Sequence, residues 1–362
     1  MKVDLSVITI TTVMKKKILV AAAALLCVAG VNAQYNFVVQ NNSSTSVYKT
    51  IDEAYTNASA GDTIYLPGGS FNMPAVDKSL TWIGVGYHPD SCNATYFTRI
   101  NNATSFTGNC DNMSISGVHF SSNLSFGSSG NPVENLNLSR CYIAGTLSLK
   151  YNDGTEATIN SRVSECIVDG TLTANRGGNI IIEKCIVRGV STYFRTSVFD
   201  RTIFTLGYRS SSLGYSYEFQ YTNECLMKNC VFNYYSYTNW NVDAPSNLNN
   251  TFWNNIFAGN ITFPQGTNTG EDNLTGVDLS TVFVGIVGNI YENPVYQDFH
   301  LAVGSPAIGA GLDGTDIGIY GGTDPFKEGG LPSNPHIRAV NIGTETTNGI
   351  LSVEISAISQ DN

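Results

Sequence analysis

The sequence has 362 residues, of which only 13% are Asp, Glu, Lys or Arg, while 42% are apolar and 11% aromatic. This apolar content excludes a disordered chain, and the length suits one or two domains or one long solenoid. The formal net charge of −10 argues against nucleic acid or an anionic membrane as a partner.

The N-terminus has the pattern of a secretory signal peptide over residues 1–33. Lys15–Lys17 form a basic start, and residues 18–30 are apolar but too short to cross a bilayer. Val-Asn-Ala at 31–33 has the small–x–small form of a signal peptidase site. We therefore expect a bacterial protein that is secreted or displayed on the cell surface.

Met14 is a candidate for the true start, because the preceding residues do not resemble a signal. Lipoprotein processing at Cys27 is an alternative, although Leu26 stands where a small residue is preferred. Residues 1–33 carry four Lys and one Asp, so their removal would change the net charge to −13. No later stretch is apolar enough for a transmembrane span.

Residues 46–60 are predicted to form an amphipathic helix, with Ile51, Ala54 and Tyr55 on one face. Two strand-like segments, 61–71 and 79–87, follow it.

Five segments of nine residues then align without gaps. They are VHFSSNLSF (118–126), CYIAGTLSL (141–149), CIVDGTLTA (166–174), CIVRGVSTY (185–193) and NIFAGNITF (255–263). Two partial copies start at Thr202 and Cys230, and successive starts lie 17 to 28 residues apart. An apolar residue stands three positions before each start: Ile115, Leu138, Val163, Ile182, Phe199, Met227 and Phe252. A period near twenty indicates a solenoid, and these seven residues should form one inward stack.

Apolar and polar residues alternate within each unit, as in Gly-Thr-Leu-Ser-Leu at 145–149, which is typical of short strands with one buried face. The central Gly or Ser indicates a bend between two such strands. Each unit should therefore form one coil of short strands, and the predicted fold is an all-β solenoid.

Four cysteines share the first repeat position: Cys141, Cys166, Cys185 and Cys230. We expect them to form a buried ladder of free thiols, since a free cysteine behaves as a small apolar residue. No CxxC pair occurs, and we expect no metal site and no cofactor. A disulfide between Cys92 and Cys110, which lie outside the ladder, is left open.

An aromatic cluster occupies residues 208–240, where the repeat is interrupted. Its candidate ligand-binding residues are Tyr208, Tyr215, Tyr217, Tyr221, Tyr234, Tyr235, Tyr237 and Trp240. Exposed rings of this kind stack on sugar faces, whereas the competing interpretation is that they pack together over the coil.

The ends of the mature chain carry further patterns. Residues 327–335 read as a linker. Residues 336–362 contain two alternating runs around Thr347-Asn348-Gly349, which predicts a short C-terminal β-hairpin extension. A partial β-sandwich module is the alternative, and the hairpin is a candidate contact for a partner.

The capping helix, the segments 61–71 and 79–87 and the terminal segments 298–311 and 316–322 resemble the pectin-lyase-like right-handed β-helix superfamily. The resemblance implies a right-handed parallel β-helix over residues 34–326. It also implies that the helix of residues 46–60 is an N-terminal cap on the open end of the coils and that residues 298–311 and 316–322 form the last coils. The superfamily contains polysaccharide lyases and hydrolases, so it also suggests a polysaccharide as ligand.

No catalytic residue is identified. The sequence lacks the Gly-His-Gly of polygalacturonases, the Arg-x-Pro-x-x-Arg of pectate lyases and the Arg-His pair of chondroitinase-like lyases. Asp169 and Arg188 share a repeat position in adjacent units and should form an ion pair between coils. His119 is expected to be exposed and His300 to be structural.

The sequence thus favours an exported, non-catalytic β-helix protein that binds glycans or serves as a surface or structural interaction protein. The alternative is a polysaccharide-degrading enzyme, either a lyase or a glycoside hydrolase, with an unrecognised site.

Overall fold

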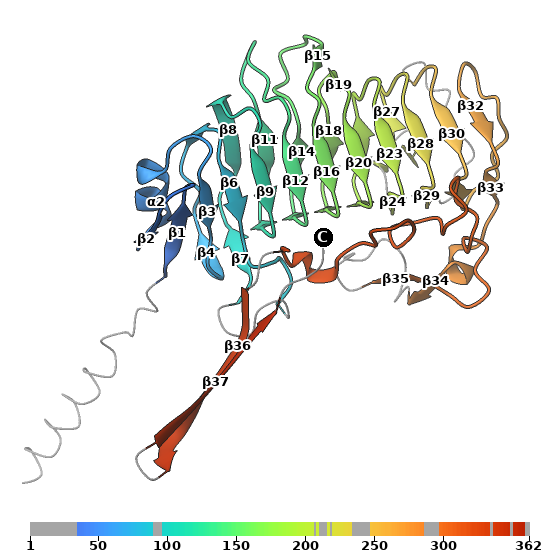
Figure 1. Cartoon of the computed structure of the whole chain (residues 1–362). Helices are drawn as coiled ribbons and strands as arrows, with labels where there is room; N and C mark the ends of the chain where they lie inside the picture. The colour runs from blue at the N-terminus through green and yellow to red at the C-terminus, as the bar shows by residue number, and fades with distance from the viewer. Residues whose placement is uncertain are drawn as a thin grey trace, which may run out of the picture. The chain divides into compact units, whose positions relative to one another are not determined.

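The computed structural model describes residues 35–89, 96–205, 208–209, 216–217, 219–233, 247–285, 297–333, 336–347 and 350–358. The predicted signal peptide and Cys92 lie outside these residues. The described chain is an all-β parallel β-helix solenoid, as predicted, built from three long sheets (Figure 1).

Sheet 1 has 12 strands, parallel except where β1 pairs with β2 and β3. In spatial order they are β2 (Thr45–Tyr48), β1 (Phe37–Gln40), β3 (Thr63–Tyr65), β6 (Thr81–Ile83), β9 (Ser114–Ser116), β12 (Asn137–Ser139), β16 (Arg162–Ser164), β20 (Ile181–Glu183), β23 (Val198–Asp200), β28 (Leu226–Lys228), β30 (Thr251–Trp253) and β32 (Thr269–Glu271).

Sheet 2 has 10 strands and sheet 3 has 7. The strands of sheet 2 are β4 (Gly69–Phe71), β7 (Thr98–Ile100), β10 (His119–Phe120), β13 (Tyr142–Ile143), β17 (Ile167–Val168), β21 (Ile186–Val187), β24 (Ile203–Phe204), β29 (Val231–Phe232), β31 (Ile256–Phe257) and β33 (Leu274–Thr275). Those of sheet 3 are β5 (Val76–Lys78), β8 (Thr104–Asn109), β11 (Leu124–Phe126), β14 (Leu147–Ser148), β18 (Leu172–Thr173), β22 (Ser191–Thr192) and β27 (Phe219–Gln220).

Short pairs complete the fold. They are β15 (Ala157–Thr158) with β19 (Gly177–Gly178), β25 (Tyr208–Arg209) with β26 (Ser216–Tyr217), β34 (Phe283–Gly285) with β35 (Asp298–Leu301), and β36 (His336–Thr347) with β37 (Ile350–Ile358). The helices are α2 (Ile51–Asn57) and the 3₁₀ turns η2 (Leu279–Thr281) and η4 (Glu328–Gly330).

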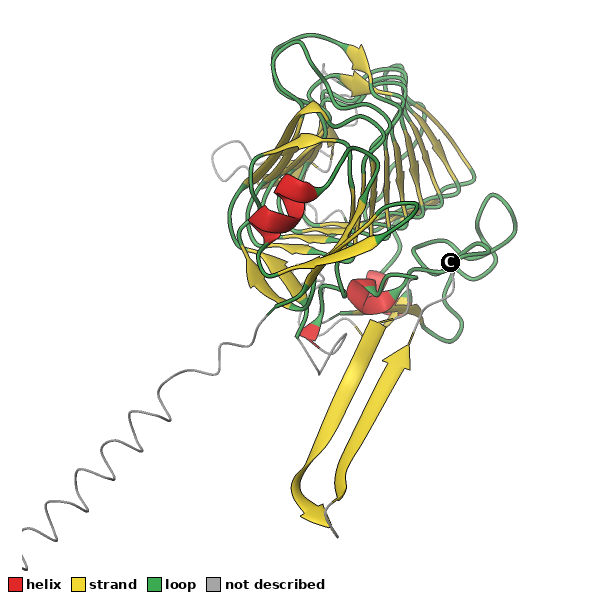
Figure 2. Cartoon of the chain, turned by 60° about the vertical axis from the view of Figure 1, so that its left-hand side comes forward, coloured by secondary structure: helices red, strands yellow, loops and turns green. Residues whose placement is uncertain are grey.

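Helix α2 lies at the N-terminal end of the stack, as Figures 1 and 2 show. It begins with a capping box, in which the Thr50 side chain accepts from the Glu53 backbone N–H and the Glu53 carboxylate accepts from the Thr50 backbone N–H. Ile51 and Ala54 are buried in the solenoid core. The predicted capping helix is confirmed, although it is shorter than residues 46–60.

The predicted inward stack of sheet 1 is also confirmed. All seven residues are buried, and each pairs in register with the next along the sheet. The third repeat position forms a parallel column on sheet 2, where Phe204, Phe232 and Phe257 stack at centroid distances of 5.0 and 4.6 Å. These columns fill the interior of the solenoid.

A column of left-handed backbone turns links sheet 1 to sheet 2. We call it the corner column: Arg140, Glu165, Lys184, Arg201, Asn229 and Asn254. Their φ angles lie between +49° and +56°, a region that non-glycine residues seldom occupy. The chain therefore changes direction at the same point in six successive coils.

The repeat glycines lie at bends between strands of sheets 2 and 3, as predicted, and the packing of the coils also requires them. The fifth-position residues Gly145, Gly170 and Gly189 are stacked with almost no room for a side chain. A Cβ on Gly170 would lie 2.4 Å from the Gly145 carbonyl oxygen, and one on Gly189 would lie 2.1 Å from that of Gly170. Close approach of backbones, rather than a special φ angle, requires glycine here.

The thiol ladder is present and buried, and its four cysteines are free. Each thiol donates to the carbonyl two residues earlier, at 3.1 Å for Cys141 and Cys230 and 3.2 Å for Cys166 and Cys185. In the next coil Asn255 takes the position, and its Oδ1 accepts from the Cys230 backbone N–H at 2.8 Å. Cys110 is likewise a buried free thiol.

The prediction that residues 298–322 form the last coils is wrong. The long sheets end at β32 and β33, and β35 pairs antiparallel with β34 instead of extending a stack. The following chain, which we call the returning segment (residues 302–333), runs back beside the coils toward the N-terminal end (Figure 1).

The returning segment covers the outer face of sheet 2. A second apolar cluster forms there between the sheet residues Tyr142, Ile167, Ile186, Ile203, Val231 and Ile256 and residues that include Phe283, Phe299, Ile317, Ile319 and Phe326. Sheet 2 is thus buried on both faces. His119, which we expected to be exposed, is half-buried on this sheet beside the rings of Phe97 and Tyr142.

The corner column holds the returning segment by at least one hydrogen bond in each of six coils. Asn254 donates to the Ala310 carbonyl, Asn229 accepts from the Leu312 N–H, and Arg201 donates to Asp313. The remaining contacts are Lys184 with the Asp324 carbonyl, Glu165 with the Lys327 N–H, and Arg140 with the Leu331 carbonyl. Part of the predicted linker 327–335 is therefore fixed to the coils.

Strands β36 and β37 form the predicted C-terminal hairpin, with Thr347 opposite Ile350. Val340 pairs with Ile355 and Ile342 with Val353, and the pair Asn341–Glu354 lies between them. Val353 and Ile355 are exposed.

Replacing Gly170 by Ala should destabilise the solenoid by about 2–4 kcal/mol, because the new Cβ overlaps the carbonyl oxygen of the preceding coil. Gly154→Ala is the control: nothing lies within 4 Å of its Cβ, and only its positive φ of 76° adds a cost, of about 1 kcal/mol. Urea unfolding monitored by circular dichroism measures the free energy of unfolding of both variants. Equal losses in the two variants would contradict the close-packing explanation.

The ladder thiols should resist alkylation in the native protein. Burial raises the pKa of Cys166, Cys185 and Cys230, so their reactive thiolate forms are suppressed. In a Cys92→Ser chain without residues 1–33, mass spectrometry should detect labelling by iodoacetamide only after denaturation. Rapid native labelling at any of these three residues would contradict the ladder.

Candidate functional site

A polar groove lies along the outer face of sheet 1 and the adjoining edge of the returning segment. Its volume is about 880 Å³. Its floor is formed by outward-facing residues of six successive strands, β6 to β23, and its wall by Arg140, Glu165, Lys184 and Arg201 with residues 322–324, Asp313, Pro332 and Ser333. Strands of a sheet lie about 4.8 Å apart, so the five intervals give a groove about 24 Å long.

The floor of the polar groove is rich in hydroxyl and amide groups because the coils stack in register. Ser116, Ser139 and Ser164 form one column, which continues as Glu183 and Asp200. Thr81, Ser114 and Asn137 form a second column, which continues as Arg162. Such groups both donate and accept hydrogen bonds at regular intervals along the groove.

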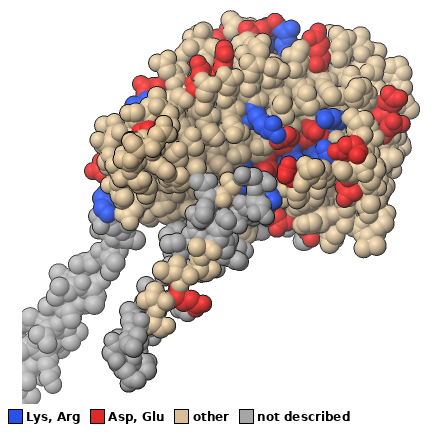
Figure 3. Space-filling view, in the orientation of Figure 1, with Lys and Arg blue, Asp and Glu red and all other residues tan. Residues whose placement is uncertain are grey.

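The charges of the polar groove are balanced. Four cations (Arg140, Arg162, Lys184, Arg201) and five anions (Glu165, Glu183, Asp200, Asp313, Asp324) line it. Most are paired: Arg140 lies 3.1 Å from Glu165, Arg201 lies 2.6 Å from Asp313, and Arg162 contacts Glu183. Figure 3 shows both signs gathered in a band on this face. The groove therefore presents polarity without a large net charge.

Two groove residues have shifted pKa values. Partial burial lowers the pKa of Lys184, an effect that the carboxylates of Glu183 and Asp324 oppose. Hydrogen bonds from Thr315 and Arg201 lower the pKa of Asp313 to about 2, so its carboxylate is ionised at all but very acidic pH. Asp313 thus remains a charged partner for the buried Arg201.

The predicted ion pair between coils is confirmed. Arg188 Nη1 lies 2.7 Å from Asp169 Oδ1, and the Tyr142 hydroxyl donates to Asp169 Oδ2 at 3.1 Å. The pair is not part of the lining of the polar groove.

The predicted aromatic residues are only partly described. Tyr215, Tyr234, Tyr235, Tyr237 and Trp240 lie outside the described residues, and Tyr208 pairs with Tyr217 between β25 and β26. The exposed Tyr221 stacks on Tyr193 of the preceding coil, with ring centroids 4.6 Å apart and an interplanar angle of 9°. Since these two rings face each other, the faces between them are covered. A sugar-binding role for the cluster remains a prediction.

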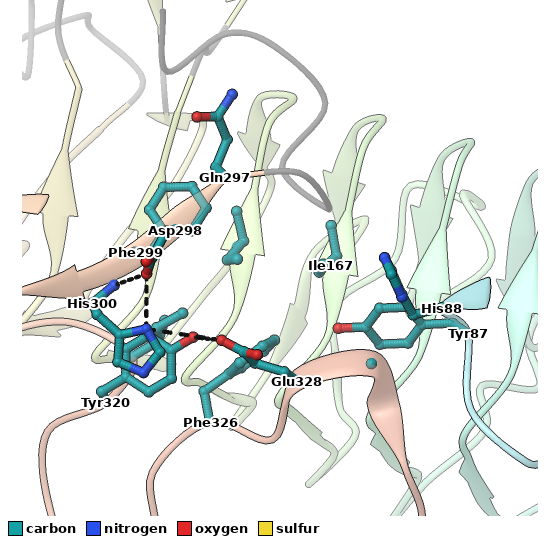
Figure 4. Close-up of a pocket in the computed structure, with 13 residues that line it drawn as sticks. Tyr87, His88, Ile167, Gln297, Asp298, Phe299, His300, Tyr320, Phe326 and Glu328 are labelled. Atoms are coloured by element: carbon teal, nitrogen blue, oxygen red, sulfur yellow. Dashed lines mark hydrogen bonds and ion pairs between the residues drawn. The ribbon is translucent and has the colours of Figure 1, made fainter. Parts of the chain in front are cut away.

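A second cavity, of about 460 Å³, lies between the returning segment, strand β35 and sheet 2 (Figure 4). We call it the aromatic pocket. Its wall includes Ile167, Ile186, Phe299, Ile319 and Phe326, and its polar groups include Tyr87, Asp298, His300, Tyr320 and Glu328. We did not anticipate this pocket, because it requires residues 298–328 to pack outside the coils.

Hydrogen bonds order the polar side of the aromatic pocket. Asp298 Oδ1 lies 2.8 Å from His300 Nδ1 and accepts the His300 backbone N–H at 2.9 Å, which lowers the pKa of Asp298. The Tyr320 hydroxyl donates to Glu328 Oε1 at 2.7 Å, and the His300 ring stacks on Tyr320 at 3.9 Å. Burial and the bond to Glu328 raise the pKa of Tyr320, so its hydroxyl remains protonated.

Among the described residues, no group of three or more His, Cys, Asp or Glu is placed to hold a metal ion. No helix in that part of the chain has the length and apolarity needed to cross a membrane. No protein-family model matches the sequence, and no curated protein matches it.

Asp313→Ala should loosen the returning segment while leaving the coils folded, because it removes the carboxylate that joins the segment to Arg201, whereas Arg201 keeps its contact with Asp200 in the coils. We expect faster hydrogen exchange in residues 310–324 and little change in sheets 1 and 3. Glu271→Ala, which removes an exposed carboxylate outside both cavities, is the control. Unchanged exchange in residues 310–324 would show that the ion pair does not hold the segment.

The pH dependence of the same contact has a defined sign. The Asp313 pKa is depressed from its ordinary value near 4 to about 2, so its stabilising effect is complete above about pH 4 and is lost as the pH falls toward 2.

Proposed function

We propose that this protein is an exported, non-catalytic β-solenoid of the pectin-lyase-like type that binds neutral glycans along the polar groove. The parallel β-solenoid and the resemblance of its N-terminal cap and first coil support the superfamily assignment. The pattern of residues 1–33 supports export.

The observation that carries the proposal is the ladder of hydroxyl and amide groups on the groove floor. Strand spacing repeats these groups at about 4.8 Å, which is close to the advance of one pyranose unit in an extended polysaccharide. A groove six strands long therefore suits a chain of several sugars, whose hydroxyls match its donors and acceptors.

The balanced charge favours a neutral glycan over a polyanion. The anions on the groove lining outnumber the cations by one, and most charges are already paired. A polyuronate would gain little from these groups, and binding of a neutral chain should depend only weakly on ionic strength.

One observation favours the alternative, a polysaccharide-degrading enzyme. Lys184 has a lowered pKa within the groove, and an amine that deprotonates more readily can act as a general base. Its Nζ, however, already donates to the Asp324 carbonyl in the returning segment. We therefore keep catalysis as the second candidate.

Ser139→Trp tests the groove by filling its centre. Trp253 occupies the same column farther along sheet 1, so a Trp pointing outward there is compatible with the fold. Against an array of neutral and acidic polysaccharides, we expect the parent protein to retain a neutral glycan. We expect Ser139→Trp to bind it about tenfold or more weakly, a change of about 1.4 kcal/mol, with an unchanged melting temperature.

Glu271→Trp is the matched control, because this exposed residue ends the same column outside the groove. Equal loss in both variants, or retention of acidic glycans only, would argue against the proposal. Formation of ultraviolet-absorbing unsaturated products that is lost in Lys184→Met would favour the enzyme.

A further inference from the structure

The aromatic pocket differs from the polar groove in its charge. Asp298 and Glu328 line it, and no Lys or Arg is among its described lining residues. Their hydrogen-bond partners are a histidine ring and a tyrosine hydroxyl, neither of which is a fixed cation. The two carboxylates therefore give the pocket a negative charge that nothing permanent neutralises.

Tyr87 supplies an independent indication of a ligand. It is only 4% exposed, yet its hydroxyl points into the aromatic pocket toward the side of Glu328 (Figure 4). Its backbone N–H donates to the Gly329 carbonyl at 2.9 Å, but the hydroxyl has no hydrogen-bond partner among the described residues. Burial raises the pKa of Tyr87, so its hydroxyl is protonated and can accept a hydrogen bond from a ligand in the pocket.

The rest of the pocket is suited to an apolar body. Ile167, Ile186 and Phe299 are nearly fully buried behind it, and the rings of Tyr87 and Tyr320 line its sides. A volume of about 460 Å³ falls in the range of small-molecule sites. Aromatic faces also attract cations, in addition to the attraction of the carboxylates.

We propose that the aromatic pocket binds a small organic ammonium ion with an apolar body. The His300 Nδ1 atom lies 2.8 Å from Asp298 and 3.9 Å from Glu328, so the ammonium group lies on the side of Glu328 that faces Tyr87. One of its N–H groups donates to the Tyr87 hydroxyl, and Asp298 adds negative charge. The apolar body packs on the isoleucine and phenylalanine wall. The proposal is independent of glycan binding in the polar groove.

Isothermal titration at pH 7 and low salt tests this with matched probes: 2-phenylethylammonium, the neutral 2-phenylethanol and the anionic phenylacetate. We expect the ammonium ion to bind at least about tenfold more tightly than the alcohol, and phenylacetate to bind more weakly than both. Glucosamine and glucose form a second pair, which distinguishes an amino sugar from a free amine as the source of the ammonium group.

Glu328→Gln and Tyr87→Phe should each weaken ammonium binding by about three- to tenfold, since each removes a polar contact with little change of shape. Glu271→Gln, an exposed carboxylate outside the pocket, should bind like the parent. Equal binding of ammonium and alcohol overturns the proposal. So does a Glu328→Gln variant with parental affinity, or the failure of both ammonium probes to bind at millimolar concentration.

Discussion

Parallel backbone hydrogen bonding between coils is the constraint on which the structure depends. It holds equivalent residues one strand spacing apart, so every repeat position becomes a column. The apolar columns fill the core, the thiols and asparagines occupy a tight corner, and the glycines allow two backbones to touch. The same register places the hydroxyl and amide groups of the polar groove at regular intervals. Core and groove thus have a single geometric origin.

The second structural theme is the cover on sheet 2. The returning segment buries an apolar outer face, and the corner column fixes its backbone coil by coil. The left-handed corners are occupied by charged and amide side chains that reach the segment. Both cavities exist because of this cover: the segment forms one wall of the polar groove and, with β35, much of the aromatic pocket.

The sequence predicted what local periodicity determines. The stack from Ile115 to Phe252, the buried thiols and the Asp169–Arg188 pair follow from aligned repeats. The course of residues 298–333 does not, because it depends on tertiary packing. The sequence did contain one indication of this cover. The second repeat position carries Ile167, Ile186 and Ile203, and the third position is apolar as well. Two consecutive apolar residues in a strand are typical of a sheet that is buried on both faces. The polar columns on the groove floor follow from the same alignment of repeats. The groove itself does not, because the returning segment forms one of its walls.

The contacts of the corner column also restrict how this protein can change length during evolution. Solenoids commonly gain or lose whole repeats, since each unit interacts mainly with its neighbours. Here residues 310 to 331 meet six successive coils in strict reverse order. Duplication or deletion of one coil in this region would shift every later partner by one position. A matching insertion or deletion in the returning segment would be needed, so the number of central coils is tied to the length of a segment distant in sequence.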